Sequence, residues 1–124
     1  MVKRSGSAIR VMIVDGNSAS RKNMTRLLLL PDDIEAVAVA RTGSETIRLA
    51  PGVEPDVILL NSNVADMDVV RLIETLAKAT SAEMVLVSVS SDPPFLQRAL
   101  RAGARCFLAD PPHADKLIET IRNL

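Results

Sequence analysis

The sequence predicts a single α/β domain built on a doubly wound, five-stranded parallel sheet. Two periodicities alternate along the 124 residues. Short continuous apolar runs are typical of strands buried on both faces, and longer stretches repeat apolar residues at helical spacing. Five such alternations favour helices on both faces of one sheet, because right-handed crossovers between parallel strands place them there. We expect residues 9–124 to form this domain and the polar, basic residues 1–8 to form a flexible tail.

The strand predictions rest on runs rich in valine, isoleucine and leucine. Most of these runs are too continuous for a half-exposed strand, so we expect buried parallel strands. The run at residues 34–40 alternates more regularly, which indicates a strand at the edge of the sheet. The five expected strands are Ile9–Val14, Ile34–Ala40, Asp56–Leu60, Met84–Ser88 and Cys106–Ala109.

The helix predictions rest on apolar residues spaced three and four apart and on residues that start or stop helices. Asn17 and Ser18 are capping residues ahead of the first helix. Pro51 and Gly52 are expected to end the second helix, and Gly103 is a natural terminator for the fourth. The five apolar stripes span residues 24–28, 47–49, 70–77, 95–100 and 117–124.

Composition excludes several classes of function. The 15 basic and 15 acidic residues balance, so no overall field attracts the chain to nucleic acid or to a membrane surface. No apolar stretch approaches the roughly 20 residues that span a bilayer. Cys106 is the only cysteine, which excludes an internal disulfide and favours a reducing cytoplasm. The scarcity of aromatic residues argues against a site that stacks a flat cofactor or base.

Polar residues stand at the carboxyl ends of four expected strands. Asp15 and Asn61 end the first and third runs, and Ser88 and Asp110 end the fourth and fifth. In open parallel sheets, ligands bind beyond the carboxyl ends of the strands, at the topological switch point. If the strand order is 2-1-3-4-5, the first and third strands flank that point. The four polar side chains are then expected to converge.

The order and spacing of several segments resemble the receiver domain of two-component response regulators. The matching segments are Ile9–Asp15, Pro55–Asn61, Met67-Asp68, Val87–Ser90 and Ala99–Pro111, and the resemblance covers about residues 9–124. It implies a CheY-like, flavodoxin-like fold with strand order 2-1-3-4-5. It also implies signalling rather than enzymatic function, through a phosphoryl group accepted on an aspartate beside Mg²⁺.

Carried over residue by residue, the resemblance places Asn61 at the phosphoacceptor position. Asp15 and Gly16 stand at the acidic pair, and Ser88 stands at the switch hydroxyl. Asp110 stands where the family has a lysine. A carboxamide is a poor nucleophile, and Mg²⁺ usually needs one or two carboxylates. We therefore expect a degenerate site without a Mg²⁺ cofactor, with Asp15 as its one weak candidate for a metal ligand.

These residues also have structural interpretations. Asp15 can cap the loop into the first helix, and Asn61 can bond neighbouring backbone groups, which we favour over a ligand contact. The resemblance implies that Ser88 and the aromatic residue Phe107 move together as a switch. The alternative, which we favour for this pair, is a satisfied strand-end hydroxyl and a plain core side chain.

The favoured function is a phosphorylation-independent protein-interaction module, or pseudo-receiver. Arg98, Arg101 and Arg105 lie along one side of the fourth helix and its exit. The resemblance implies that the surface of the fourth helix, fifth strand and fifth helix binds partners. We expect a homodimer, a protein partner or a fused output domain of a longer chain there, and no direct contact with nucleic acid or membrane.

The alternative function is a small-anion or nucleotide-binding flavodoxin-like domain. Residues 16–20 contain a glycine, an asparagine and two serines. Such a loop can present amides and hydroxyls to an anion at the positive end of the first helix.

Overall fold

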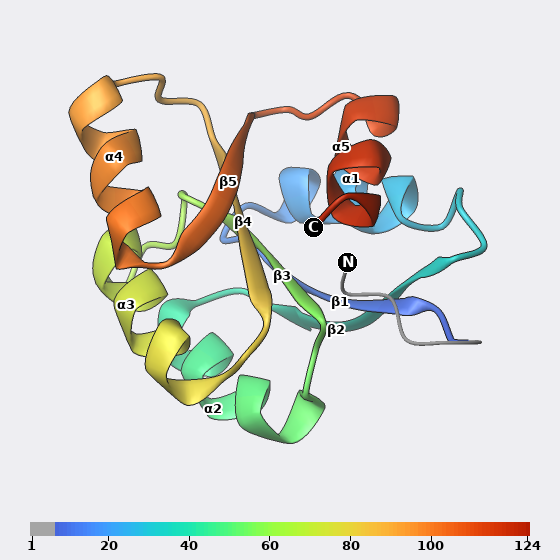
Figure 1. Cartoon of the computed structure of the whole chain (residues 1–124), viewed down its shortest axis with the longest axis horizontal. Helices are drawn as coiled ribbons and strands as arrows, with labels where there is room; N and C mark the ends of the chain where they lie inside the picture. The colour runs from blue at the N-terminus through green and yellow to red at the C-terminus, as the bar shows by residue number, and fades with distance from the viewer. Residues whose placement is uncertain (1–6) are drawn as a thin grey trace.

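The computed structural model describes residues 7–124, which form a parallel sheet with helices on both faces (Figure 1). The strand order is β2-β1-β3-β4-β5, with β2 at one edge as its alternating pattern predicted. The fold class and the strand order are confirmed. The strands are β1 (Ile9–Val14), β2 (Ile34–Ala40), β3 (Val57–Asn61), β4 (Glu83–Ser88) and β5 (Ala104–Ala109).

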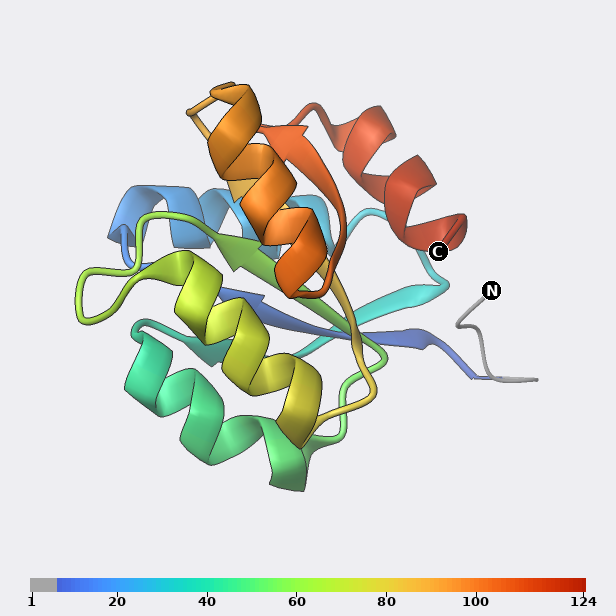
Figure 2. The same cartoon turned by 60° about the vertical axis from the view of Figure 1, so that its left-hand side comes forward.

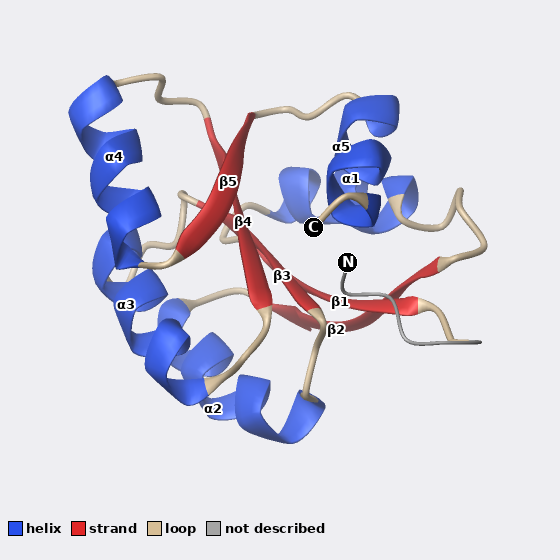
Figure 3. Cartoon of the chain, in the orientation of Figure 1, coloured by secondary structure: helices blue, strands red, loops and turns tan. Residues whose placement is uncertain are grey.

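The helices divide between the two faces of the sheet (Figures 2 and 3). One face is covered by α1 (Ser18–Leu27) and α5 (Ala114–Arg122), and the other by α2 (Gly43–Val53), α3 (Val69–Ala79) and α4 (Pro93–Ala102). Each face has its own core, because successive strand residues point to opposite sides. In β1, Met12 packs on the side of α2, α3 and α4, whereas Ile13 packs on the side of α1 and α5. Burial on both faces explains why the strand runs are continuously apolar.

The third strand differs from the sequence prediction by one residue at each end. It begins at Val57 rather than Asp56, and it includes Asn61, which lies opposite Val87 of β4. Asp56 instead turns its side chain toward β1, where Oδ2 accepts the backbone N–H of Arg10 at 2.9 Å. Asn61 is therefore held by the sheet itself.

The prediction that Pro51 and Gly52 end the second helix is wrong. Helix α2 continues to Val53, and the left-handed residue that follows it is Glu54, with φ 51°. Pro51 removes one helical hydrogen bond, and only Gly52 and Val53 follow it in the helix, so little of the helix lies beyond the disturbance. The backbone N–H of Glu54 still donates to the carbonyl of Ala50 at 3.0 Å. Gly103 ends α4 as predicted.

The expected tail of residues 1–8 falls mostly on residues 1–6, which lie outside the described residues. In the part of the chain that the structure describes, no helix combines the length and apolar content needed to cross a membrane.

Asp66 anchors the loop between β3 and α3 to the start of α2. Its Oδ1 accepts the backbone N–H of Gly43 at 2.7 Å, and its Oδ2 accepts the N–H and hydroxyl of Ser44 at 3.0 and 2.9 Å. The first N–H groups of a helix have no partner within it, and the helix dipole favours a negative charge there. The amides of Ser44 and then Gly43 lower the pKa of Asp66 below its ordinary value. This contact positions the loop that leaves the carboxyl end of β3.

Replacing Asp66 with alanine is expected to lower the thermal midpoint at pH 7, because the start of α2 loses three acceptor contacts. A carboxyl with a depressed folded-state pKa stabilises the protein above its unfolded-state pKa, here near 3.8. That stabilisation disappears as the pH falls through the lower folded-state value. Melting curves by circular dichroism should therefore converge for wild type and Asp66→Ala once the pH falls below the folded-state pKa of Asp66. Ser44→Ala, which removes one contact, should show a smaller difference, and a gap that persists undiminished in acid would contradict the assignment.

Candidate functional site

The carboxyl ends of β1, β3 and β5 bring Asp15, Asn61 and Asp110 together. Asn61 is 1% exposed, and its Nδ2 lies 3.4 Å from Asp15 Oδ2 and 3.3 Å from Asp110 Oδ2. The backbone N–H of Asn63 donates to Asn61 Oδ1 at 3.0 Å, so the amide nitrogen must face the acids. A single amide group therefore contacts two carboxylates that come from opposite sides of β3.

The buried carboxylate of Asp15 accepts hydrogen bonds from four neutral groups. Its Oδ1 accepts the backbone N–H of Asn17 at 2.9 Å and Nδ2 of Asn63 at 2.8 Å. Its Oδ2 accepts the hydroxyl of Ser20 and the amide of Asn61. A buried charge is costly unless it is hydrogen-bonded, and these four donors satisfy it without a positively charged side chain. The bond from Asn17 is the loop-capping contact that the sequence suggested for Asp15.

The loop between β1 and α1 uses its polar groups internally. The N–H of Gly16 donates to Asn63 Oδ1 at 2.8 Å, and the N–H of Ser20 donates to Asn17 Oδ1 at 2.9 Å. The hydroxyl of Ser20 is engaged by Asp15. The amides of Gly16, Asn17 and Ser20 and the hydroxyl of Ser20 are thus bonded within the protein rather than offered to an anion, and the carboxylate of Asp15 repels anions.

Ser88 and Phe107 differ in their surroundings. Ser88, at the end of β4, is buried, and its Oγ lies 3.1 Å from both the hydroxyl of Ser62 and the backbone N–H of Ser90. Ser88 thus has the contacts of a satisfied strand-end hydroxyl. Phe107 is 45% exposed, so the interpretation of this residue as a core side chain is wrong. The reason is that β5 is the last strand of the sheet, and its side chains have a neighbouring strand on one side only.

A surface with three cations lies on α4 and β5. Arg98 and Arg101 of α4 and Arg105 of β5 are exposed, and no salt bridge pairs them with an acid within residues 7–124. Leu100 and Phe107 are the exposed large apolar residues of the same two elements. Helix α4 lies directly against β5 (Figure 2), so the exposed residues of the two elements belong to the same region of the molecule.

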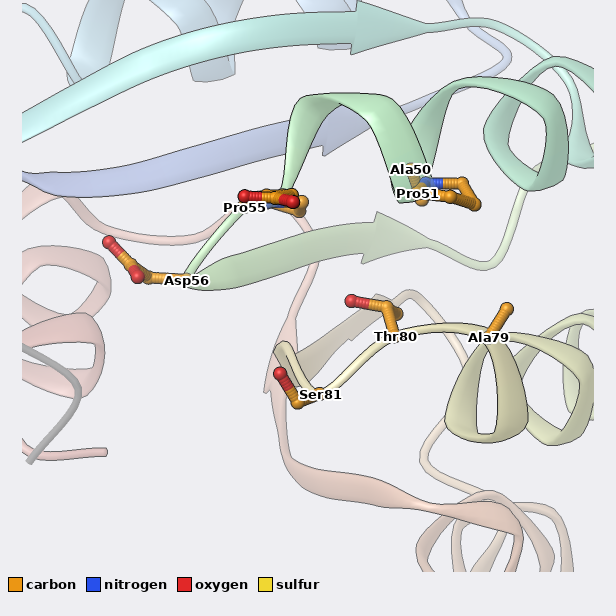
Figure 4. A pocket seen from close by; sticks show the side chains of 8 residues that line it. Ala50, Pro51, Pro55, Asp56, Ala79, Thr80 and Ser81 are labelled. Atoms are coloured by element: carbon orange, nitrogen blue, oxygen red, sulfur yellow. The ribbon is translucent and has the colours of Figure 1, made fainter.

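A pocket of about 460 Å³ lies at the other end of the sheet (Figure 4). Its walls are the last turn of α2 and the loops that precede β3 and β4. It shares no residue with the cluster of Asp15, Asn61 and Asp110. The lining residues are Ala50, Pro51, Glu54, Pro55, Asp56, Ala79, Thr80 and Ser81.

Sequence reasoning missed the side chain of Asn63 and the hydroxyl of Ser20 as parts of the site. Asn63 was not among the candidate site residues. A signal for its backbone contact was present, since a side-chain oxygen of asparagine often accepts the N–H two residues further on, and Asn61 and Asn63 have this spacing. The contact of Asn63 with Asp15 crosses 48 residues of sequence, and no local pattern indicates it.

Comparisons with known proteins agree with the fold and with the resemblance. Residues 11–122 match the family model of the response regulator receiver domain. The chain belongs to this family. This receiver domain is 27% identical over 114 residues to the chemotaxis protein CheY of Listeria monocytogenes, with 91% of this chain and 95% of that protein covered.

Other relatives are longer than this receiver domain. It is 33% identical over 107 residues to a protein-glutamate methylesterase/protein-glutamine glutaminase of Carboxydothermus hydrogenoformans, with 85% of this chain but only 30% of that protein covered.

The signal receiver domain of the response regulator NarL from Mycobacterium tuberculosis superposes with a TM-score of 0.88 at 23% identity, over 94% of this chain and 95% of that chain. This last likeness shows the shared fold alone.

The family resemblance implies a Mg²⁺ ion among the carboxylates, and the residues of this receiver domain do not fit that ion. Mg²⁺ needs hard oxygen ligands, usually including one or two carboxylates, in a near-octahedral arrangement. Asp15 is fully buried, and neutral donors occupy both of its oxygens. The group of Asn61 that faces Asp15 and Asp110 is an amide nitrogen, which is a donor and not a ligand for a hard cation.

Replacing Asn61 with aspartate is expected to destabilise the domain by about 3–5 kcal/mol at pH 7, the cost of an uncompensated buried charge. The new carboxyl would face Asp15 and Asp110, so its folded-state pKa should be raised. A raised pKa means that protonation of the new carboxyl restores stability. The loss of stability relative to wild type should therefore shrink as the pH falls from 7 toward 5. Asn61→Ala is the control: it should cost about 1–3 kcal/mol through the unsatisfied partners, with a weaker pH dependence. Urea unfolding across this pH range measures both, and equal stability of Asn61→Asp and wild type at pH 7 would refute the expectation.

Proposed function

We propose that this receiver domain is a phosphorylation-independent protein-interaction module. The observation that carries the proposal is the amide of Asn61, held between Asp15 and Asp110 at the family's phosphoacceptor position. A carboxamide is a poor nucleophile toward phosphorus. Both ends of this amide are also engaged, since its oxygen accepts the N–H of Asn63. This position therefore offers no group that could attack a phosphodonor.

Asp110 supports the same proposal through its charge. In the family, a lysine at this position pairs with the phosphoryl oxygens, whereas this chain places a carboxylate 3.3 Å from the amide of Asn61. Two unit charges about 4 Å apart interact by roughly 4 kcal/mol at an effective dielectric constant of about 20. Replacing a cation with an anion turns that attraction into a repulsion of similar size. The site would resist a bound phosphoryl group even if a donor delivered one.

The proposed activity is the docking of a protein on the surface formed by α4, β5 and α5. Three exposed arginines lie on the same two elements, α4 and β5, as exposed Leu100 and Phe107. Interfaces combine apolar anchors with a charged rim, and complementary charge favours the correct partner. The arginines suit a partner with an acidic rim. The occupant is a second copy, a separate protein or an output domain, as in relatives that carry this domain as a fraction of a longer chain.

Beryllofluoride with Mg²⁺, which mimics a phosphoryl group on aspartate, is expected to leave the thermal midpoint of the wild-type domain unchanged. The reason is that the site offers no acceptor carboxylate at residue 61 and no cation at residue 110. Differential scanning fluorimetry with millimolar beryllofluoride and Mg²⁺ measures this, with a receiver that has the aspartate and lysine as the positive control. Saturable stabilisation of the wild-type domain would overturn the phosphorylation-independent proposal.

Charge reversal on α4 is expected to weaken self-association by at least about tenfold, because like charges across an interface cost several kcal/mol. The variant is Arg98→Glu/Arg101→Glu. The matched control is Lys22→Glu/Arg26→Glu, which makes the same charge change on exposed residues of α1. Light scattering over a concentration series measures the association constant of each. A monomer in all three proteins, or an equal loss in both variants, would exclude a homodimer through this surface.

A further inference from the structure

We infer that Gly16 and Asn63 form a clasp that replaces the bridging divalent cation between the loop after β1 and the loop after β3. In the family such an ion would join these loops by binding acidic and carbonyl oxygens of both. Here the two loops are joined by direct hydrogen bonds. The inference rests on the proposed function, because it explains how the carboxyl edge of the sheet is held together without phosphorylation chemistry.

The clasp consists of two hydrogen bonds made by a single side-chain amide. Asn63 Oδ1 accepts the N–H of Gly16 at 2.8 Å, and Asn63 Nδ2 donates to Asp15 Oδ1 at 2.8 Å. The amide thus bonds two successive residues of the other loop with its acceptor and its donor. The backbone N–H of Asn63 in turn donates to Asn61 Oδ1 at 3.0 Å, which ties the clasp to the end of β3.

The absence of a side chain at Gly16 makes this contact possible. A Cβ at Gly16 would lie 2.6 Å from the backbone oxygen of Asn63 and 3.4 Å from its Oδ1. The nearer atom belongs to the backbone, so it cannot turn aside as a flexible side chain would. Any other residue at this position would push the two loops apart. Glycine at residue 16 therefore has two consequences at once: the acidic pair lacks its second acid, and the two loops can approach closely.

The clasp also covers the carboxylate that a cation would need. Asp15 is completely buried, and the amide of Asn63 occupies its Oδ1 together with the N–H of Asn17. A hydrated cation would have to displace these donors and separate the loops to reach it. Unlike Mg²⁺, a neutral amide carries no net positive charge, but it is covalently attached and always present. Restoring an aspartate at residue 61 and a lysine at residue 110 should consequently not be enough to restore cation binding.

Hydrogen exchange of the Gly16 amide tests the clasp in the metal-free wild-type domain. In Asn63→Ala the Gly16 N–H loses its acceptor, and its exchange should accelerate by about tenfold or more, the change expected when one hydrogen bond is lost. The Gly43 amide, which donates to Asp66, is the internal control and should be unaffected. Unchanged exchange at Gly16 in Asn63→Ala would overturn the inference.

A Mg²⁺ titration tests whether the clasp excludes the ion. Asn61→Asp/Asp110→Lys, with the clasp intact, should show little Mg²⁺-dependent rise in thermal midpoint, whereas the same protein with Asn63→Ala added should bind Mg²⁺ at least about tenfold more tightly. Equal responses of the two variants, whether both bind or neither binds, would refute exclusion by the clasp. Mg²⁺ binding by the wild-type domain would also refute exclusion by the clasp, whereas the proposed function fails only if beryllofluoride with Mg²⁺ stabilises the wild-type domain. Circular dichroism establishes that each variant is folded. The exchange experiment does not depend on the two variants used in the Mg²⁺ titration.

Discussion

The buried carboxylate of Asp15 is the constraint on which the carboxyl edge of this sheet depends. A fully buried charge must be hydrogen-bonded or paired, and here four neutral donors from two loops, the first turn of α1 and β3 surround it. Satisfying Asp15 draws the loop after β1 onto the loop after β3. It also orients the amide of Asn61, which reaches Asp110 on the far side of β3. The same carboxylate that suggests a metal site is, in this chain, the centre of a closed hydrogen-bond network.

The hydrogen-bond network at the carboxyl edge is separate from the cores that hold the fold together. The fold rests on two cores, one on each face of the sheet, and neither core uses the polar residues at the carboxyl edge. A change of nucleophile, acidic pair or lysine can therefore leave the architecture intact. The buried polar groups at the carboxyl edge must still be hydrogen-bonded. Side-chain amides can do this permanently, whereas a cation would have to be bound from solution. The exposed surface of α4 and β5 lies outside the network.

The sequence predicted most of the fold because burial on both sheet faces leaves a strong local signal. Its errors occurred at the end of a helix and at the edge of the sheet. Pro51 was expected to end α2, but the helix continues for two more residues to a left-handed Glu54. Phe107 was interpreted as core because it is aromatic and lies in an apolar run. Its place on an edge strand leaves nearly half of the side chain exposed.

The sequence by itself determined the family, the strand order that the family implies and the residue types at the carboxyl ends of the strands. Asp15, Asn61 and Asp110 could be expected to meet because parallel strands end at a common edge. Only the tertiary structure decided what they do there. The orientation of the Asn61 amide, the contact of Asn63 with Asp15 and the lack of room for a Cβ at Gly16 depend on how two loops, separated by more than 40 residues of sequence, pack against each other. Such distances are set by packing and hydrogen-bond satisfaction across the fold, and no local sequence pattern encodes them.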